Sequence, residues 1–139
     1  TKISKISKTT EARSVGDAAF PDWLNINSEF EIIYKMPIRV LYFLFSPFPW
    51  QITKITHLIG MLDSLLYLLL FYFIFRNLKT IGNNPGLIII SLILLSYFAM
   101  FGIGVGNFGT SIRHKVKFVI LIILLAAPYI PKIILLKKN

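Results

Sequence analysis

The chain has 139 residues, of which 55% are hydrophobic and only 15% are charged. Because soluble domains carry about a quarter charged residues, this balance favours a chain that has a lipid bilayer as its solvent. The formal net charge is +9, but the Lys and Arg residues stand at the ends of apolar runs, where anionic lipid head groups are simpler partners than nucleic acid. The chain has no cysteine, which excludes disulfides and thiolate metal sites. The sequence indicates neither a metal nor another cofactor.

Residues 1–31 form a polar segment that holds five of the six acidic residues. They show no sustained hydrophobic period, which predicts a loop or tail. Within it, Trp23 is a candidate interfacial anchor; the alternative is a leader without a role of its own. The chain begins with Thr and lacks the order of a signal peptide. We therefore expect either a processed product or the C-terminal piece of a longer membrane protein.

The first apolar run covers residues 32–48, but Lys35, Pro37 and Arg39 interrupt it. A charge near the centre of a spanning helix costs about 3 kcal/mol on insertion scales. If the span began only at Arg39, too few residues would remain to cross about 30 Å of hydrocarbon. The run is therefore either a tilted span or an interfacial or re-entrant helix.

Three further runs, at residues 58–75, 87–105 and 118–136, are long enough to span a membrane. The last of them contains Pro128 and Pro131, which a membrane helix tolerates as a kink where neighbouring groups satisfy the freed carbonyls. The sequence thus predicts an all-α, polytopic membrane protein with three spans, plus the less regular segment at 32–48.

The connection expected between the last two spans, residues 106–118, reads GNFGTSIRHKVKF and contains no acid. The positive-inside rule does not orient the chain, because each side of the membrane would hold four basic residues. One of the two basic connections around the span at 87–105 must face outward. Binding of an anionic substrate group would explain a basic connection there.

The composition of this connection suits an anion site. Glycines at positions 102, 104, 106 and 109 permit positive φ, so successive amides could form an anion nest. A guanidinium grips phosphate through two parallel N–H bonds, and an ammonium acts as a point charge. The expected substrate-binding residues are Asn107, Thr110, Arg113, Lys115 and Lys117, together with Arg39. The alternative is an ordinary basic loop at the head groups, with the glycines as helix packing points.

Two residues are candidates for proton transfer. Asp63 is the only acid after residue 31, and carboxylates inside a span are usually functional or paired with a basic group. Its possible partners are Arg39, Arg113 and Lys132; alternatively, it lies near enough to the boundary to reach water. His114 could accept a proton beside an anion site, or it is only a solvated side chain.

Three stretches, PIRVLYFLFSPFPWQ, GMLDSLLYLLLFYFIFR and GNFGTSIRHKVKFVILIILLAAPYI, resemble the C-terminal end of bacterial inner-membrane proteins of surface polysaccharide synthesis. The similarity is to O-antigen or capsular repeat-unit polymerases and covers residues 13–131. Its most specific element is the pattern Asn-x-Gly-Thr-x-Ile-Arg-His-x-x-Lys-Phe at 107–118. Ser111 and Lys115 are mild departures, since the relatives would have Ala and Arg there.

This resemblance implies a fragment of a multi-pass enzyme of the bacterial inner membrane that transfers a glycan from an undecaprenyl diphosphate carrier to another lipid-linked repeat. Such enzymes need no nucleotide sugar and no metal. Arg113 and Lys115 would hold the diphosphate, and Asp63 or His114 would act as a base. The alternative is a non-enzymatic membrane component, such as part of a transporter or flippase or a small scaffold, whose basic residues bind anionic lipid.

Overall fold

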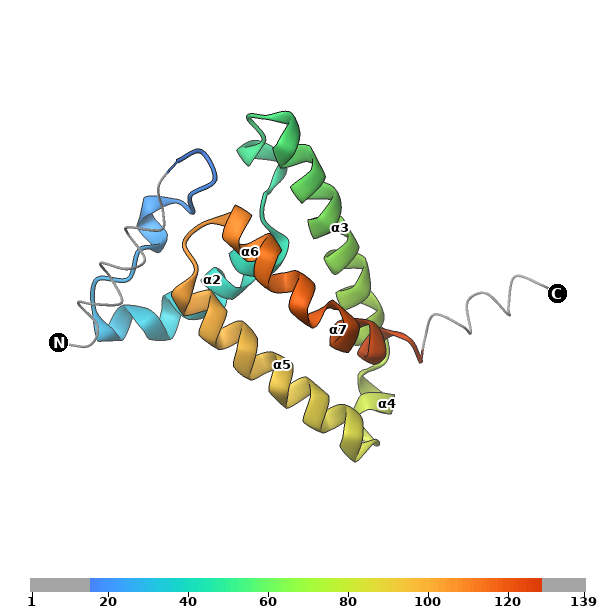
Figure 1. Ribbon diagram of the computed structural model, residues 1–139. Coiled ribbons are helices and arrows are strands. Elements are labelled where there is room, and N and C mark those ends of the chain that lie inside the picture. The colour runs from blue at the N-terminus through green and yellow to red at the C-terminus, as the bar shows by residue number, and fades with distance from the viewer. Residues whose placement is uncertain (1–15, 129–139) are drawn as a thin grey trace.

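The computed structural model describes residues 16–128, and regular structure in this part of the chain is helical apart from one isolated bridge between Ala19 and Asn107. The predicted all-α class is therefore confirmed for these residues (Figure 1). The helices are α2 (Glu29–Phe45), α3 (Ile55–Arg76), α4 (Leu78–Gly82), α5 (Pro85–Gly104), α6 (Phe108–Lys115) and α7 (Val119–Ala126), with short 3-10 turns at Asp22–Leu24, Pro49–Gln51 and Val116–Phe118.

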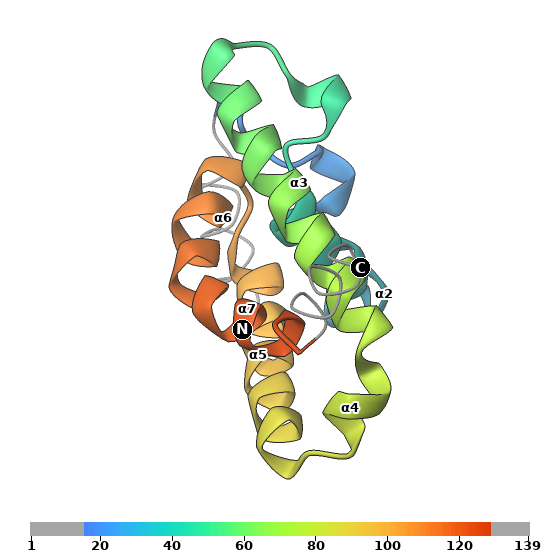
Figure 2. The same ribbon diagram turned by 90° about the vertical axis from the view of Figure 1, so that its right-hand side faces the viewer.

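The two longest helices, α3 and α5, are long and apolar enough to cross a membrane. They have 22 and 20 residues, which at 1.5 Å per residue is about the thickness of the hydrocarbon layer. Most of their apolar side chains are exposed, whereas the core helix of a soluble protein would be mostly buried. They correspond to the predicted spans at 58–75 and 87–105, and α4 joins them at one end (Figures 1 and 2).

The basic stretch at 106–118 is mostly a helix and not a loop, so this expectation is wrong. The 3-10 turn at Val116–Phe118 links α6 to α7, and the chain is helical from residue 108 to residue 126. Asn107 starts the helix, since its Oδ1 accepts hydrogen bonds from the N–H of Gly109 at 2.7 Å and of Thr110 at 3.4 Å. The chain reverses within residues 105–107. The predicted span at 118–136 is thus helical to 126, and its part beyond 128 lies outside the described residues.

The helical run 108–126 lies beside α3 and points in the same direction. At the start, the His57 ring meets the Phe108 ring edge-on, with centroids 4.9 Å apart. Farther along, Gly60 faces Ile112, and at the far end the Asn77 Nδ2 donates to the Leu125 carbonyl at 3.3 Å. Residues about fifty positions apart in the sequence are therefore neighbours along the whole pair.

The helix α2 packs against α3 and α5 and ends inside the bundle. Its last residue, Phe45, meets Phe71 edge-on at 5.7 Å, and Phe71 lies about 24 Å along α3 from the start of that helix. The chain then turns back past Pro47, which lies against Gly60, to the start of α3. The apolar run at 32–48 is thus helical to residue 45, and its course as a tilted span or as an interfacial or re-entrant helix stays a prediction.

Gly102 allows the close approach of α2 to α5. A Cβ at this position would lie 2.6 Å from the Val40 Cγ2 and 3.2 Å from the Val40 backbone nitrogen. The small-residue packing alternative thus holds for Gly102.

We expect Gly102→Ala to lower the free energy of unfolding by about 1–3 kcal/mol, because the backbone of α2 must shift. Gly104→Ala is the matched control, since a Cβ there has nothing within 4 Å, and it should leave stability unchanged or slightly raised. The measurement is unfolding in mixed micelles followed by circular dichroism. Equal effects of the two substitutions would contradict this packing role.

The described part of the N-terminal segment is tied to the reversal at 105–107. The Phe20 N–H donates to the Gly106 carbonyl at 2.8 Å, and the Phe108 N–H donates to the Ala18 carbonyl at 2.9 Å. Phe20 and Leu24 are buried, whereas Trp23 is half exposed. Residues 16–28 therefore cover the end of the bundle at which α6 begins.

Candidate functional site

The basic residues expected at the site fall into two groups. Arg39 and Lys115 are fully buried, whereas Arg113 and Lys117 are exposed. Along the helical run 108–126, neighbouring positions point in different directions. The Lys115 side chain therefore points into the bundle, whereas those of Arg113 and Lys117, two residues away on either side, point outward.

The Arg39 guanidinium binds four backbone carbonyls. Its Nε donates to Gly102 at 2.8 Å, and its Nη2 donates to Val105 at 2.7 Å and Ile103 at 3.1 Å. Its Nη1 donates to Leu24 at 2.7 Å. The last carbonyls of a helix lack intrahelical partners and carry partial negative charge. The structure therefore places Arg39 as a clasp between the N-terminal segment and the end of α5, with a side chain inaccessible to an external ligand.

Lys115 pairs with Asp63, a partner that the sequence did not suggest. The Lys115 Nζ lies 3.1 Å from the Asp63 Oδ2 and donates to the Leu44 carbonyl at 3.0 Å. It also stands 4.9 Å from the centroid of the Tyr67 ring, a favourable position for a cation. The Lys115 side chain is 0% exposed and that of Asp63 is 24% exposed. The ion pair thus joins α3, α6 and the end of α2.

Buried hydroxyl and amide groups follow the same pattern as these cations. The Ser64 Oγ donates to the Ser46 carbonyl at 2.7 Å, at the point where α2 has ended and the chain turns back. Where no water is present, an unpaired carbonyl costs several kcal/mol. Polar side chains inside the bundle therefore donate hydrogen bonds to carbonyls that have no intrahelical partner where a helix ends.

The other expected site residues lie around α6. The His114 ring is partly buried against the Phe101 ring, with centroids 4.5 Å apart. Asn107 and Thr110 belong to the helix start, where the amides of residues 109 and 110 are already bonded to the Asn107 side chain. Among the described glycines only Gly16 has positive φ. The anion nest expected from the glycines is therefore not formed.

Asn107→Ala removes this cap, and we expect it to lower the free energy of unfolding by about 1 kcal/mol. Asn107→Asp keeps the acceptor and should retain most of the stability. Thermal unfolding of the three proteins in the same detergent measures the effect. A wild-type melting temperature for Asn107→Ala would show that the cap does not hold the helix start.

Arg113 and Lys117 remain as the accessible part of the site. They are four residues apart on one helical run, which places them on the same face. Neither makes an ion pair with another residue of the part described. Two neighbouring cations repel each other, and an anion between them would relieve that repulsion.

One further pair of opposite charges lies at the start of α3. Lys54 lies 2.7 Å from Asp17, and both side chains are largely exposed. The hydrogen bond from Lys54 holds the pKa of Asp17 below its ordinary value. Residues 16–128 contain no group of three or more His, Cys, Asp or Glu side chains that could hold a metal ion.

The pairing of Asp63 with Lys115 had only a partial signal in the sequence. Asp63 stands eight residues after the start of α3, and Lys115 stands seven residues after the start of α6. Recognising Asn107 as a cap would have given the start of α6. Because α3 and α6 start side by side, Asp63 and Lys115 then lie at about the same depth along their helices.

No family model, curated protein or solved structure matches this chain. The accessible basic side chains among the expected site residues are those of Arg113 and Lys117, and His114 is next to Arg113 in the sequence.

Proposed function

We propose that this chain is a membrane-embedded part of a protein that binds the phosphate of a lipid-linked glycan. The observation that carries the proposal is the pair of exposed cations, Arg113 and Lys117, on one face of the run 108–126. The glycan itself comes from the resemblance of residues 107–118 to polysaccharide polymerases of the bacterial inner membrane.

The membrane location is supported by the surfaces of α3 and α5. Both are long enough to span, and they expose large apolar side chains along their length, such as Ile59, Leu66, Leu92 and Met100. Contiguous apolar surface of this extent on a protein marks a membrane or protein interface. The end of α2 inside the bundle also suits a bilayer. The Leu44 and Ser46 carbonyls, at the point where this helix ends, accept hydrogen bonds from the Lys115 and Ser64 side chains and therefore do not need water.

The proposed roles differ between the two cations. Arg113 would hold phosphate oxygens through parallel N–H bonds, and Lys117 would add a point charge one turn away. Asp63 is engaged by Lys115, so His114 is the better candidate for a proton acceptor in the transfer step. Arg39 and Lys115 support the site through the fold and do not contact the substrate in this proposal.

Replacing Arg113 by Ala in the full-length protein, in its own host, tests the proposal. We expect long-chain glycan to be lost while the amount of protein in the membrane stays normal. Lys54→Ala is the control, since Lys54 is an exposed cation at the start of α3, outside the proposed site, and it should leave glycan length unchanged. Normal chain length with Arg113→Ala would reject the proposal.

A non-enzymatic membrane component is the second candidate, favoured by the structural use of Arg39 and Lys115. In that case Arg113 and Lys117 bind anionic lipid head groups, for which a point charge suffices. Arg113→Lys should then be silent, whereas a bidentate phosphate site should be impaired by it.

A further inference from the structure

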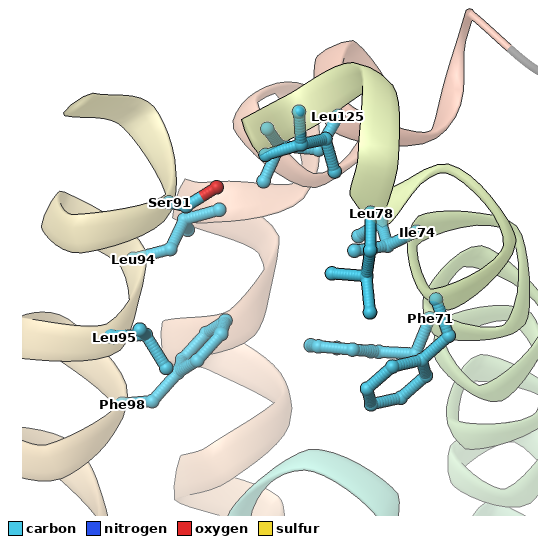
Figure 3. A pocket seen from close by; sticks show the side chains of 10 residues that line it. Phe71, Ile74, Leu78, Ser91, Leu94, Leu95, Phe98 and Leu125 are labelled. Carbon is cyan, nitrogen blue, oxygen red and sulfur yellow. The ribbon is translucent and has the colours of Figure 1, made fainter. Parts of the chain in front are cut away.

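An apolar cavity of about 190 Å³ lies between α3, α4, α5 and α7, as Figure 3 shows. Its floor consists of buried side chains from all four helices: Ile74, Ile81, Leu94, Phe98 and Leu125. An apolar cavity of about 150 Å³ can stay free of water and take up a small hydrocarbon. This cavity is therefore suited to a hydrocarbon group.

The rim of the cavity opens to the outside of the bundle. Phe75, Leu78 and Leu95 line it and are 67%, 53% and 63% exposed. Ser91 is the polar side chain in the lining, and its hydroxyl is bound to the Leu87 carbonyl at 2.8 Å. The lining thus offers a ligand no free polar group, and the rim faces the region where α3 and α5 would meet lipid.

Positive charge stands at one end of the cavity. Lys79 is exposed and lies on the short helix α4 between Leu78 and Ile81, both of which line the cavity. The sequence has no acid after Asp63. This end is therefore complementary to an anionic head group.

The depth of the cavity fits a lipid chain. Its residues on α5, from Ser91 to Phe98, lie about 9–20 Å along the helix from Pro85. Pro85 follows the polar turn after α4, close to Lys79. A chain in the cavity would thus begin just below the level of Lys79 and run into the hydrocarbon layer.

We infer that the cavity seats an acyl chain of an anionic phospholipid whose phosphate lies at Lys79. The inference rests on the membrane location proposed above. The site is distinct from Arg113 and Lys117, which lie on a different helical segment from Lys79. It would bind a resident lipid and not the glycan carrier.

Fluorescence quenching by brominated lipids tests the inference. The chain has two tryptophans, and replacing Trp23 and Trp50 by Phe gives a background for a single reporter. One reporter is Leu95→Trp at the rim; the matched reporter is Ile93→Trp, at nearly the same depth on α5 but absent from the lining. Each full chain is placed in phosphatidylcholine vesicles that contain a minor share of brominated phosphatidylglycerol or brominated phosphatidylcholine.

At Leu95→Trp we expect about a fivefold preference for phosphatidylglycerol, since one basic residue near an anionic lipid has an effect of that order. Ile93→Trp should be quenched equally by both lipids. Lys79→Gln should lower the preference, and Ser91→Phe, which fills the cavity, should abolish it. If Ser91→Phe fails to insert, Ser91→Leu serves the same purpose.

Equal quenching by the two lipids at Leu95→Trp would overturn the inference. An equal preference at both reporters would also overturn it, because a general surface charge effect would then explain the result. Quenching by neither lipid would instead refute the membrane location, so failure of the cavity and failure of the proposed function give different results.

Discussion

Arg39→Ala should destabilise the fold by about 3–5 kcal/mol. The substitution leaves four buried carbonyls without a donor, those of Leu24, Gly102, Ile103 and Val105. Each unsatisfied buried group costs about 1–3 kcal/mol, part of which is regained where relaxation or water supplies a partner. Because these carbonyls belong to α5 and to the N-terminal segment, both elements should loosen together.

The measurement is the free energy of unfolding in mixed micelles. Arg39→Lys should be intermediate, since an ammonium cannot reach donors as far apart as a guanidinium can. Arg113→Ala is the matched control, because it removes the same side chain from an exposed position, and it should change stability by no more than about 0.5 kcal/mol. Similar values for the two Arg→Ala variants would refute the role of Arg39 as a clasp.

Lys115→Met should cost about 3–5 kcal/mol, because it leaves the Asp63 carboxylate partly buried without its counter-charge. It also removes the donor to the Leu44 carbonyl. Asp63→Leu should be destabilising for the converse reason, since it leaves a fully buried ammonium with only a carbonyl and an aromatic ring beside it.

The double variant Lys115→Met, Asp63→Leu distinguishes pairing from two independent effects. A buried pair replaced by apolar residues of similar size often costs little, so the double variant should be more stable than either single one. Free energies of unfolding for the four proteins give the coupling energy as a double-mutant cycle. Strict additivity would show that Asp63 and Lys115 do not act on each other.

The sequence predicted the parts of the fold that depend on local composition. The apolar runs at 58–75 and 87–105 correspond to α3 and α5 within three residues at each end, because length and hydropathy decide such helices. For residues 32–48 the sequence left several alternatives open, and the structure shows a helix that ends at Phe45 inside the bundle. The prolines and charges of this run argued against a full membrane span but did not show at which residue the chain would turn.

The errors at the site have a different origin. Arg113, His114, Lys115 and Lys117 together indicated a loop, because unpaired charges suit water. Two of the chain's cations find carbonyls far away in the sequence instead: Arg39 reaches residues 102–105, and Lys115 reaches Leu44. Such contacts follow from the tertiary arrangement and leave no periodic signal. Asn107 as a helix cap was the one local feature that could have revealed the helix.

The ion pair between Asp63 and Lys115 has a consequence for biogenesis. The run 108–126 carries three cations, Arg113, Lys115 and Lys117, between its sixth residue and its midpoint, and a helix with such charges partitions poorly into lipid by itself. In the membrane location proposed above, α3 and α5 carry no such group of charges apart from the single carboxylate of Asp63, so they would enter the bilayer as independent helices. The Asp63 carboxylate on α3 would then stabilise the later insertion of the run 108–126 by pairing with Lys115. We therefore expect residues 108–126 to pack last, in a second stage of assembly, against α3 and α5 that are already inserted.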